Sequence, residues 1–333
     1  MNVRRRIVSV VAVFLVFTIA VLLLAPTVGS TPISLARVFD RSIPWTDNVD
    51  AQIFFVARLP RVLSGALVGA ALAAAGVVLQ AMLRNPLATP FTLGVSAGGA
   101  LGAILAIALG LDIGAMGVSS IPIASFTGSL LAIGIVYALA SSQRRGLSTN
   151  VLLLAGVTLN SFFSALILFV QFMSDYTQSL RAVRWLMGDL DVGSYAPILA
   201  ALPFLVAAFA VFAVLPRSLN LLSMGDDVAA ARGVDVTRAQ RGAFLSASLA
   251  TGAAVSLGGP IGFIGIVVPH LVRLMVGADH RVVLPAAALF GAAFTVLCDL
   301  AARTIIAPIE LPVGVITALI GGPFFLWLLV KRS

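Results

Sequence analysis

Long apolar runs separated by short polar or charged stretches make up most of this sequence. About 20 consecutive apolar residues in a helix span the roughly 30 Å hydrocarbon core of a bilayer, so each run predicts one membrane-crossing helix. Ten such runs occur, near residues 7–27, 62–82, 92–111, 120–140, 150–172, 195–215, 242–257, 260–276, 282–301 and 312–330. The apolar stretch from 242 to 277 is too long for one crossing, and Gly258-Gly259-Pro260 predicts the break within it.

This pattern predicts an all-α membrane protein with about ten crossings in a single transmembrane domain over residues 1–333. Composition agrees, because 60% of the residues are hydrophobic, 10% are charged and the mean hydropathy is +1.10. In soluble globular proteins the apolar share is nearer half and the charged share about a quarter. A soluble fold is therefore excluded, and too little chain remains outside the runs for a separate soluble domain.

The first apolar run follows Arg4, Arg5 and Arg6, an arrangement that signal peptides share. The run is longer than the apolar core of a typical signal peptide, and Ala25-Pro26-Thr27 is a poor cleavage site. We therefore expect this run to be retained as the first transmembrane helix.

The charged residues predict how the helices are oriented. Ten crossings place both termini on one side, where the termini and loops hold 14 of the 21 basic and 4 of the 13 acidic residues. The opposite loops hold 7 basic and 9 acidic residues. Cytoplasmic loops carry an excess of Lys and Arg, so we expect cytoplasmic termini and a location in the inner (cytoplasmic) membrane. The excess of basic over acidic residues is explained by this orientation and does not indicate a nucleic-acid partner.

Five separated blocks resemble the permease subunits of the iron-siderophore, haem and vitamin B12 branch of bacterial ABC importers. The blocks are Arg58 to Arg61 with Arg84-Asn85-Pro86 and the segment to Gly99, Arg144 to Gly156, Leu222 to Val234, Gly262 to Arg281, and Glu310 to Val315. They occur in the same order as in that family and cover nearly the whole chain, so chance is a poor explanation.

The resemblance implies the permease architecture of an ABC type II importer. Its partners would be a second copy of the chain, two separate ABC ATPase subunits, a soluble or lipid-anchored substrate-binding protein, and membrane lipid. The cargo would be a bulky metal chelate carried into the cytoplasm; ferric siderophore is favoured because that subgroup is the largest, and haem and cobalamin are the alternatives. No cofactor is implied.

Several arginines fall at the outer ends of the predicted helices. Arg58, Arg61 and Arg303 match the positions with which the family docks its binding protein, and the alternative is anchoring in the lipid headgroups. For Arg181 and Arg184 both interpretations stay open. Asp299 precedes Arg303 by four residues, a spacing that favours an ion pair on one helix face.

The longest inner loop, about 217–241, is the candidate ATPase coupling segment of the family. We expect Asp226 to cap a short helix that ends at Arg232 and Gly233. Exposed apolar residues around this helix would contact the ATPase, and the alternative is a helix lying in the headgroups. The candidate coupling residues are Leu221, Leu222, Met224, Gly225, Asp226, Arg232 and Gly233, with Val228 beside them.

Two further groups have both a structural and a functional interpretation. Ser148, Thr149 and Asn150 begin a helix and form an N-cap cluster; in the family this turn also narrows the cytoplasmic gate. Small or polar residues in the second and third runs either line the pathway or allow close helix packing. These candidate pathway residues are Gln80, Asn85, Pro86, Gly94, Ser96 and Gly98.

The sequence also argues against other functions. It contains no Gly-x-x-x-x-Gly-Lys-Ser/Thr phosphate loop, so we expect ATP hydrolysis to belong to another subunit and the chain not to be an enzyme. Cys298 has no partner cysteine, and His270 and His280 lack acidic or thiolate neighbours at ligand spacing, so no metal site is expected. The predicted crossings hold almost no acidic residues, which disfavours the distant alternative, an ion-coupled secondary transporter.

Overall fold

The computed structural model describes residues 3–111, 117–141 and 147–332, and these residues form helices and no β-strand. The α-helices are α1 (Val3–Leu24), α2 (Leu35–Val38), α3 (Val49–Gln52), α4 (Leu59–Met82), α5 (Val95–Ala108), α6 (Ser120–Ser141), α7 (Thr149–Met173), α8 (Tyr176–Leu186), α9 (Ala196–Val214), α10 (Pro216–Leu222), α11 (Asp226–Ala231), α12 (Val236–Gly258), α13 (Ile264–Val276), α14 (His280–Thr304) and α15 (Val313–Arg332). A π-helix, Ile53–Arg58, joins α3 to α4, and 3-10 turns lie at Ala25–Thr27 and Pro90–Leu93.

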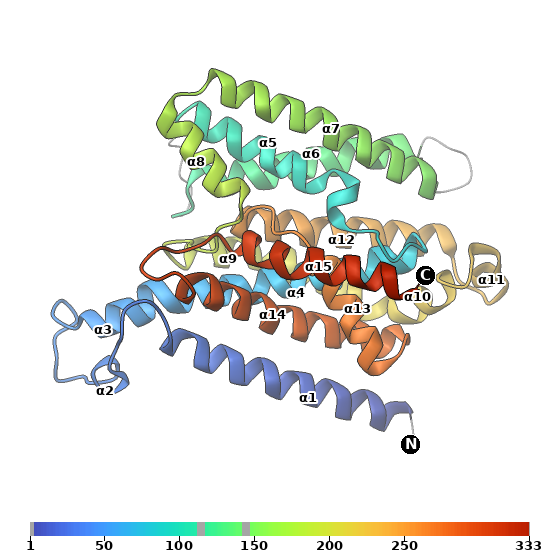
Figure 1. The fold of residues 1–333 in the computed structure, drawn as a ribbon. Helices are drawn as coiled ribbons and strands as arrows, with labels where there is room; N and C mark the ends of the chain where they lie inside the picture. Colours follow the sequence, from blue (N-terminus) through green and yellow to red (C-terminus); the bar gives the residue numbers. More distant parts are fainter. Residues whose placement is uncertain (1–2, 112–116, 142–146, 333) are drawn as a thin grey trace.

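The long helices lie side by side along one direction (Figure 1). Helix α1 forms one outer edge and α7 the opposite edge, with α4, α12 and α14 between them. Both termini lie at the same end as α10 and α11, which we call the α11 end. Helices α2, α3 and α8 lie at the opposite end, which we call the α8 end.

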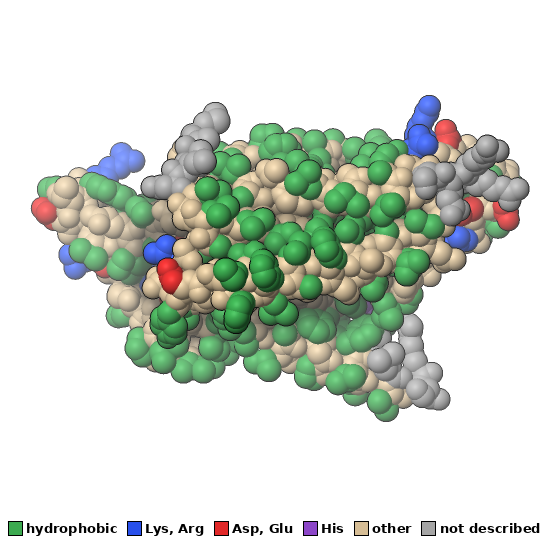
Figure 2. All heavy atoms as spheres, turned by 90° about the horizontal axis from the view of Figure 1, so that it is seen from above, with side chains coloured by type: hydrophobic (Ala, Val, Ile, Leu, Met, Phe, Trp, Pro, Cys, Tyr) green, Lys and Arg blue, Asp and Glu red, His purple; other side chains and the backbone are tan. Residues whose placement is uncertain are grey.

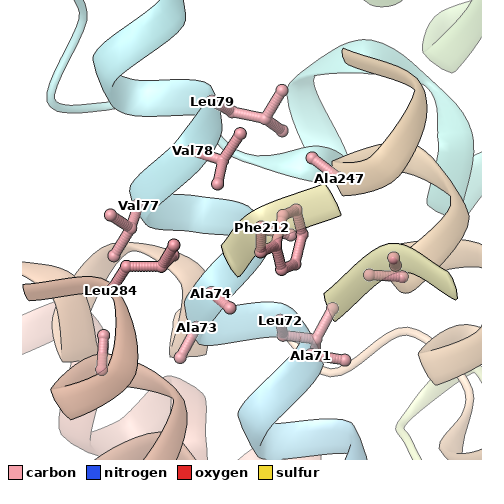
Figure 3. Packing of buried hydrophobic residues seen from close by; sticks show 14 of the residues in the cluster. Ala71, Leu72, Ala73, Ala74, Val77, Val78, Leu79, Phe212, Ala247 and Leu284 are labelled. Atoms are coloured by element: carbon pink, nitrogen blue, oxygen red, sulfur yellow. The ribbon is translucent and has the colours of Figure 1, made fainter. Parts of the chain in front are cut away.

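Helix α4 is the centre of the packing, with contacts to α12, α13 and α14. Its alanine-rich sequence brings small side chains to every face, and Phe212 of α9, Ala247 of α12 and Leu284 of α14 lie around it (Figure 3). The backbones touch at two glycines. A Cβ atom on Gly69 would lie 2.1 Å from the carbonyl oxygen of Gly291, and one on Gly76 would lie 2.1 Å from that of Gly265. Small residues allow this close approach, as is common between membrane helices.

The surface has the polarity of a membrane protein. Hydrophobic side chains cover the middle of the visible face, whereas acidic and basic side chains gather toward the two ends (Figure 2). Among the residues that the structure describes, six helical segments are long and apolar enough to cross a membrane, and three shorter helices are also apolar. Each of the ten predicted runs coincides with a helix, but this criterion of length and hydropathy does not yield ten crossings.

The predicted break at Gly258-Gly259-Pro260 is confirmed, because α12 ends at Gly258 and Gly259 adopts a φ of 68°. The predicted start of the second helix near residue 62 is wrong. Helical structure is continuous from Val49 to Met82. Proline normally ends a helix because it lacks an N–H and crowds the preceding turn. Here a wide π-helical turn, Ile53–Arg58, directly precedes α4, and Pro60 lies in the first turn of α4. The helical structure therefore continues through Pro60.

Helix α8 was not expected from the apolar pattern, because it is a short amphipathic helix in a predicted outer loop. Its start is fixed by Asp175, whose side chain accepts a hydrogen bond from the backbone N–H of Gln178, while the Gln178 side chain bonds back to the N–H of Asp175. This reciprocal capping box is a sequence signal of a helix start. The pair Asp175 and Gln178 could therefore have revealed α8.

Candidate functional sites

A cluster of five charged side chains lies at the α8 end, and we call it the arginine cluster: Arg58, Arg61, Asp299, Arg303 and Glu310. Arg61 Nε lies 2.9 Å from Asp299 Oδ1, and Arg61 Nη1 lies 2.6 Å from Glu310 Oε2. Arg303 Nε lies 3.0 Å from Asp299 Oδ2, which confirms the expected pairing of these two residues. The cluster joins α4 to α14 and to the loop before α15.

The loop after α1 covers two members of the cluster. Arg58 Nη1 donates to the carbonyl oxygen of Pro26 at 3.2 Å, and Arg58 Nη2 donates to that of Thr31. Arg303 Nη1 donates to the carbonyl oxygen of Val28 at 3.5 Å. Arg58 and Arg303 are 5% and 3% exposed as a result.

The expectation that Arg58, Arg61 and Arg303 form an exposed outer rim is therefore wrong about exposure. The sequence predicts these arginines at helix ends. The helical segment that contains Arg58 and Arg61 instead begins at Val49, so both residues lie inside it. Their side chains contact α14 and the loop after α1. Within the cluster only Glu310 has a substantially exposed side chain, at 43%, against 11% for Arg61.

Exposed basic side chains at the α8 end lie on helix α8. Arg181 and Arg184 are both exposed and stand three residues apart, so they lie on one side of the helix. Ala182 on the other side is buried, and it packs with Ile104 and Ile167. Helix α8 thus presents a basic face at the surface of the α8 end.

At the other end, α10 and α11 form the candidate coupling segment. The expectation that Leu222 contacts a partner is wrong, because Leu222 is 0% exposed and packs into the main hydrophobic core. Leu221 is half-buried against the same core. The exposed apolar side chains are Met224 and Val228, at 64% and 38%. A coupling surface on this segment is therefore smaller than the sequence suggested.

The short helix is present, but its start differs from the expected one. Gly225 is the N-cap residue, with a φ of 124°, and Asp226 stands in the first helical turn. A backbone with this φ favours glycine, which explains Gly225. Arg232 is the C-cap and Gly233 follows with a φ of 82°, as expected for a helix end. Asp226 pairs with Arg84 beyond the end of α4, at 3.4 Å.

The candidate gate residues begin α7. Ser148 is the N-cap, and its hydroxyl oxygen accepts a hydrogen bond from the N–H of Val151 at 3.5 Å. Thr149 is half-buried and Asn150 is exposed. The N-cap interpretation is thus confirmed, and the gate role stays a prediction. Arg144 and Arg145, which precede this turn, lie outside the described residues.

The candidate pathway residues lie in two separate places. Gln80, Asn85 and Pro86 lie at the α11 end of α4, where Gln80 Nε2 donates to the carbonyl oxygen of Gly265 at 2.9 Å. The other group belongs to the turn before α5 and to α5, which packs against α6 and α7. Gly94 has a φ of 77°, Ser96 is buried, and Gly98 approaches the backbone of α6 closely.

Polar side chains also join α10 to the start of α14. Asn220 Nδ2 donates to Asp279 Oδ1 at 2.8 Å, and Asn220 Oδ1 accepts from the backbone N–H of His280 at 2.9 Å. Hydrogen bonding from the Arg281 guanidinium, with further bonds from Asn220 and the Arg281 N–H, holds the pKa of Asp279 well below its usual value. Within the described ranges, no group of three His, Cys, Asp or Glu side chains is placed to hold a metal ion.

Comparison with known proteins defines the class of this membrane protein. Residues 15–331 match the model of the FecCD transport family. Because this match covers nearly all of the sequence, the chain belongs to the FecCD transport family and is a membrane permease of the ABC importer type.

Three relatives illustrate the range of the family. The hemin transport system permease of Yersinia pestis is 40% identical over 210 residues, 63% of this chain and 62% of its own length. The cobalamin import permease of Halobacterium salinarum is 42% identical over 236 residues, 68% of this chain and 63% of its own. The Fe(3+)-citrate import permease of Bacillus subtilis is 34% identical over 305 residues, 92% of this chain and 89% of its own.

The fold is also similar to that of a solved structure. An inward-facing structure assigned to the metal-chelate type of ABC transporter has a TM-score of 0.83 and 31% sequence identity. The similarity covers 97% of this chain and 99% of that one. The expected all-α importer permease architecture and the location in the cell membrane are thus confirmed.

Proposed function

We propose that this chain is the permease subunit of an ATP-driven importer for a bulky metal chelate, with ferric siderophore as the first candidate cargo. The observation that carries the proposal is the similarity over almost the whole chain to a transporter of the metal-chelate type. The named relatives carry hemin, cobalamin and Fe(3+)-citrate, all of them metal complexes. Haem and cobalamin are the alternative cargoes.

The permease would work with partner subunits, because its sequence contains no phosphate loop for ATP. Two copies of the chain would enclose the pathway, and two separate ATPases would bind at the α11 end. Met224 just before α11 and Val228 within it are exposed, and they are the apolar side chains suited to that contact. ATP binding would move the coupling segment and so change the side to which the pathway opens.

A substrate-binding protein would dock at the α8 end. Arg181 and Arg184 are exposed there and suit acidic side chains of a partner. Arg61 would take part by exchanging its exposed partner Glu310 for a carboxylate of the binding protein. Arg58 and Arg303 lie beneath the loop after α1 and would contribute once this loop is lifted.

The gate would lie at the start of α7, where Ser148, Thr149 and Asn150 supply small polar groups without a net charge. Gly94, Ser96 and Gly98 on the neighbouring segment allow α5, α6 and α7 to approach closely. Both termini and α11 would face the cytoplasm, as the excess of basic residues on that side favours.

Co-purification tests the proposal and its cargo together. The tagged permease, expressed in its source cell and extracted in mild detergent, should carry an ATPase subunit and a binding protein. Mass spectrometry of the ligand released from that binding protein should find a ferric chelate. Haem or cobalamin would select an alternative cargo within the proposal. Absence of any ATPase from the purified complex would overturn it.

A further inference from the structure

A cavity of about 440 Å³ opens at the α11 end, between the end of α4, α13 and the start of α14. We call it the α13 cavity. Its size is within the range of about 300–1,000 Å³ that is usual for ligand pockets. Its lining includes the candidate pathway residues Gln80, Asn85 and Pro86, but the proposed function assigns no ligand to it.

The lining of the α13 cavity carries the positive charge of two arginine side chains. Arg84 and Arg273 supply two guanidinium groups, and His270 and His280 supply two imidazoles. Ser223 adds a hydroxyl group. No carboxylate stands among the described residues that line it.

The arrangement of Arg273 is fixed by its neighbour. Arg273 Nη2 donates to Gln80 Oε1 at 2.5 Å, and Gln80 Nε2 in turn donates to the carbonyl oxygen of Gly265 at 2.9 Å. Gln80 is 5% exposed, so the amide is held in the wall of the cavity and keeps the guanidinium at its edge. Gln80 therefore helps to hold the Arg273 guanidinium in the wall of the cavity.

Arg84 also lines the cavity, and its backbone conformation is unusual. Its φ of 51° lies in the left-handed region, which residues other than glycine seldom adopt. Such conformations persist only where the surrounding structure holds them, and they cluster at ligand clamps and switch regions. Here the turn sends Arg84 to the mouth of the cavity, where it reaches Asp226 of α11 at 3.4 Å.

We propose that the α13 cavity binds a phosphate-class anion, supplied either by a soluble phosphate compound or by a phospholipid headgroup. Two guanidinium groups suit phosphate because each offers several N–H donors in a planar fork. The polar side chains Gln80 and Ser223 supply further hydrogen-bonding groups in the wall. The cavity lies at the α11 end, beside the end of α4 and the start of α14, so it is near the end of the helices and not in the middle of the hydrophobic span.

Anion binding would also act on the coupling segment. Arg84 pairs with Asp226 over 3.4 Å, and both side chains are about 40% exposed. An anion in the cavity competes with Asp226 for the same guanidinium. It would therefore weaken the contact between α4 and α11, so that occupancy of the cavity influences the mobility of α11.

The test uses the full-length permease purified in detergent free of phospholipid, titrated calorimetrically with inorganic phosphate. Arg84→Gln and Arg273→Gln should each weaken binding at least tenfold. Asp226→Asn should strengthen it about threefold, because it removes the competing carboxylate. The matched control is Arg238→Gln, at the same end but with an 89% exposed side chain outside the cavity, and it should leave binding unchanged.

A parallel experiment distinguishes the two sources of the anion. The same proteins are placed in phosphatidylcholine nanodiscs with or without phosphatidylglycerol, and retained lipid is counted by native mass spectrometry. Phosphate binding in detergent supports a soluble ligand, whereas retention of phosphatidylglycerol that the two Arg→Gln changes abolish supports a headgroup. The proposal is overturned if neither ligand binds, or if Arg238→Gln weakens binding as much as Arg84→Gln does.

Discussion

Arg61 Nε lies 2.9 Å from Asp299 Oδ1 and joins α4 to α14 with side chains that are only 11% and 2% exposed. Asp299 also pairs with Arg303, so one buried carboxylate serves two guanidinium groups. Burial of charge is costly unless each ion keeps its partner. Asp299 is therefore the residue on which the arrangement of the arginine cluster depends.

Asp299→Ala should destabilise the protein by about 3–5 kcal/mol, because it leaves buried arginines without their counter-ion. Glu310→Gln removes a 43% exposed partner of Arg61 and should cost less than about 1 kcal/mol. Unfolding in detergent, followed by tryptophan fluorescence, measures both. Equal losses for the two variants would show that Asp299 has no special place in the cluster.

Gly76→Ala should destabilise the core, because the new Cβ atom would stand 2.1 Å from the carbonyl oxygen of Gly265 and force α4 and α13 apart. Overpacking of this kind costs about 1–3 kcal/mol. The matched control is Gly134→Ala in α6, where nothing lies within 4 Å of the added atom. It should be neutral or slightly stabilising. The same unfolding assay compares them, and a neutral Gly76→Ala would contradict the close contact of the two backbones.

The basic face of α8 gives a docking test that does not disturb the core. Arg181→Glu with Arg184→Glu should slow association of the cognate binding protein at least fivefold, because the change replaces attraction by repulsion. Association of the wild type should slow as salt rises, since exposed charges are screened within about 10 Å at 0.1 M salt. Stopped-flow fluorescence measures the rates. Arg238→Glu at the α11 end is the control, and a rate that depends on neither salt nor the α8 arginines would contradict docking there.

Substitutions at Leu222 and Met224 test different properties: stability at the buried Leu222 and contact with the ATPase at the exposed Met224. Leu222→Asp places a charge in the core and should lower stability by several kcal/mol, because Leu222 is 0% exposed. Met224→Asp changes a 64% exposed side chain and should leave stability within about 0.5 kcal/mol. If α11 contacts the ATPase, Met224→Asp should nevertheless reduce capture of that subunit in a pull-down. Normal capture and normal uptake would favour a helix that lies in the headgroups.

The hydrogen bonds to Asp279 at the start of α14 predict that the free energy of unfolding depends on pH. Because the pKa of Asp279 is lowered in the folded protein, its charge contributes stability that is fully present above the unfolded value of about 3.9. This contribution is lost as the pH falls below that value toward the folded pKa. Asp279→Asn should therefore be less stable than the wild type at pH 7, with a difference that shrinks below about pH 4. Unfolding curves at both pH values test this, and a constant difference would contradict it.

The apolar pattern predicted the long helices well, because about 20 apolar residues in a row have few alternatives to a membrane helix. The number of ten crossings stays a prediction. It missed α8, whose amphipathic sequence carries no long apolar run, although the capping pair Asp175 and Gln178 marks its start. It also missed the helical turns before Leu59, because Arg58 and Arg61 interrupt the apolar pattern there.

The surroundings of the candidate functional side chains were predicted less well than the helices. The sequence identified Arg58, Arg61 and Arg303 but not their burial, which depends on the loop after α1 and on Asp299, far apart in the chain. Likewise, Leu222 and Met224 are neighbours of similar hydrophobicity, and only the packing of α10 decides which one faces solvent. Tertiary contacts of this kind leave no local signal in a single sequence.

Transport by the reconstituted complex tests the central claim most directly. The permease, its co-purified ATPase and its binding protein are placed in liposomes, and entry of the chelate carried by that binding protein is followed with radioactive metal. The account predicts uptake that requires ATP together with all three components and that persists when ion gradients are collapsed. Uptake without the ATPase, driven by an ion gradient, would contradict it.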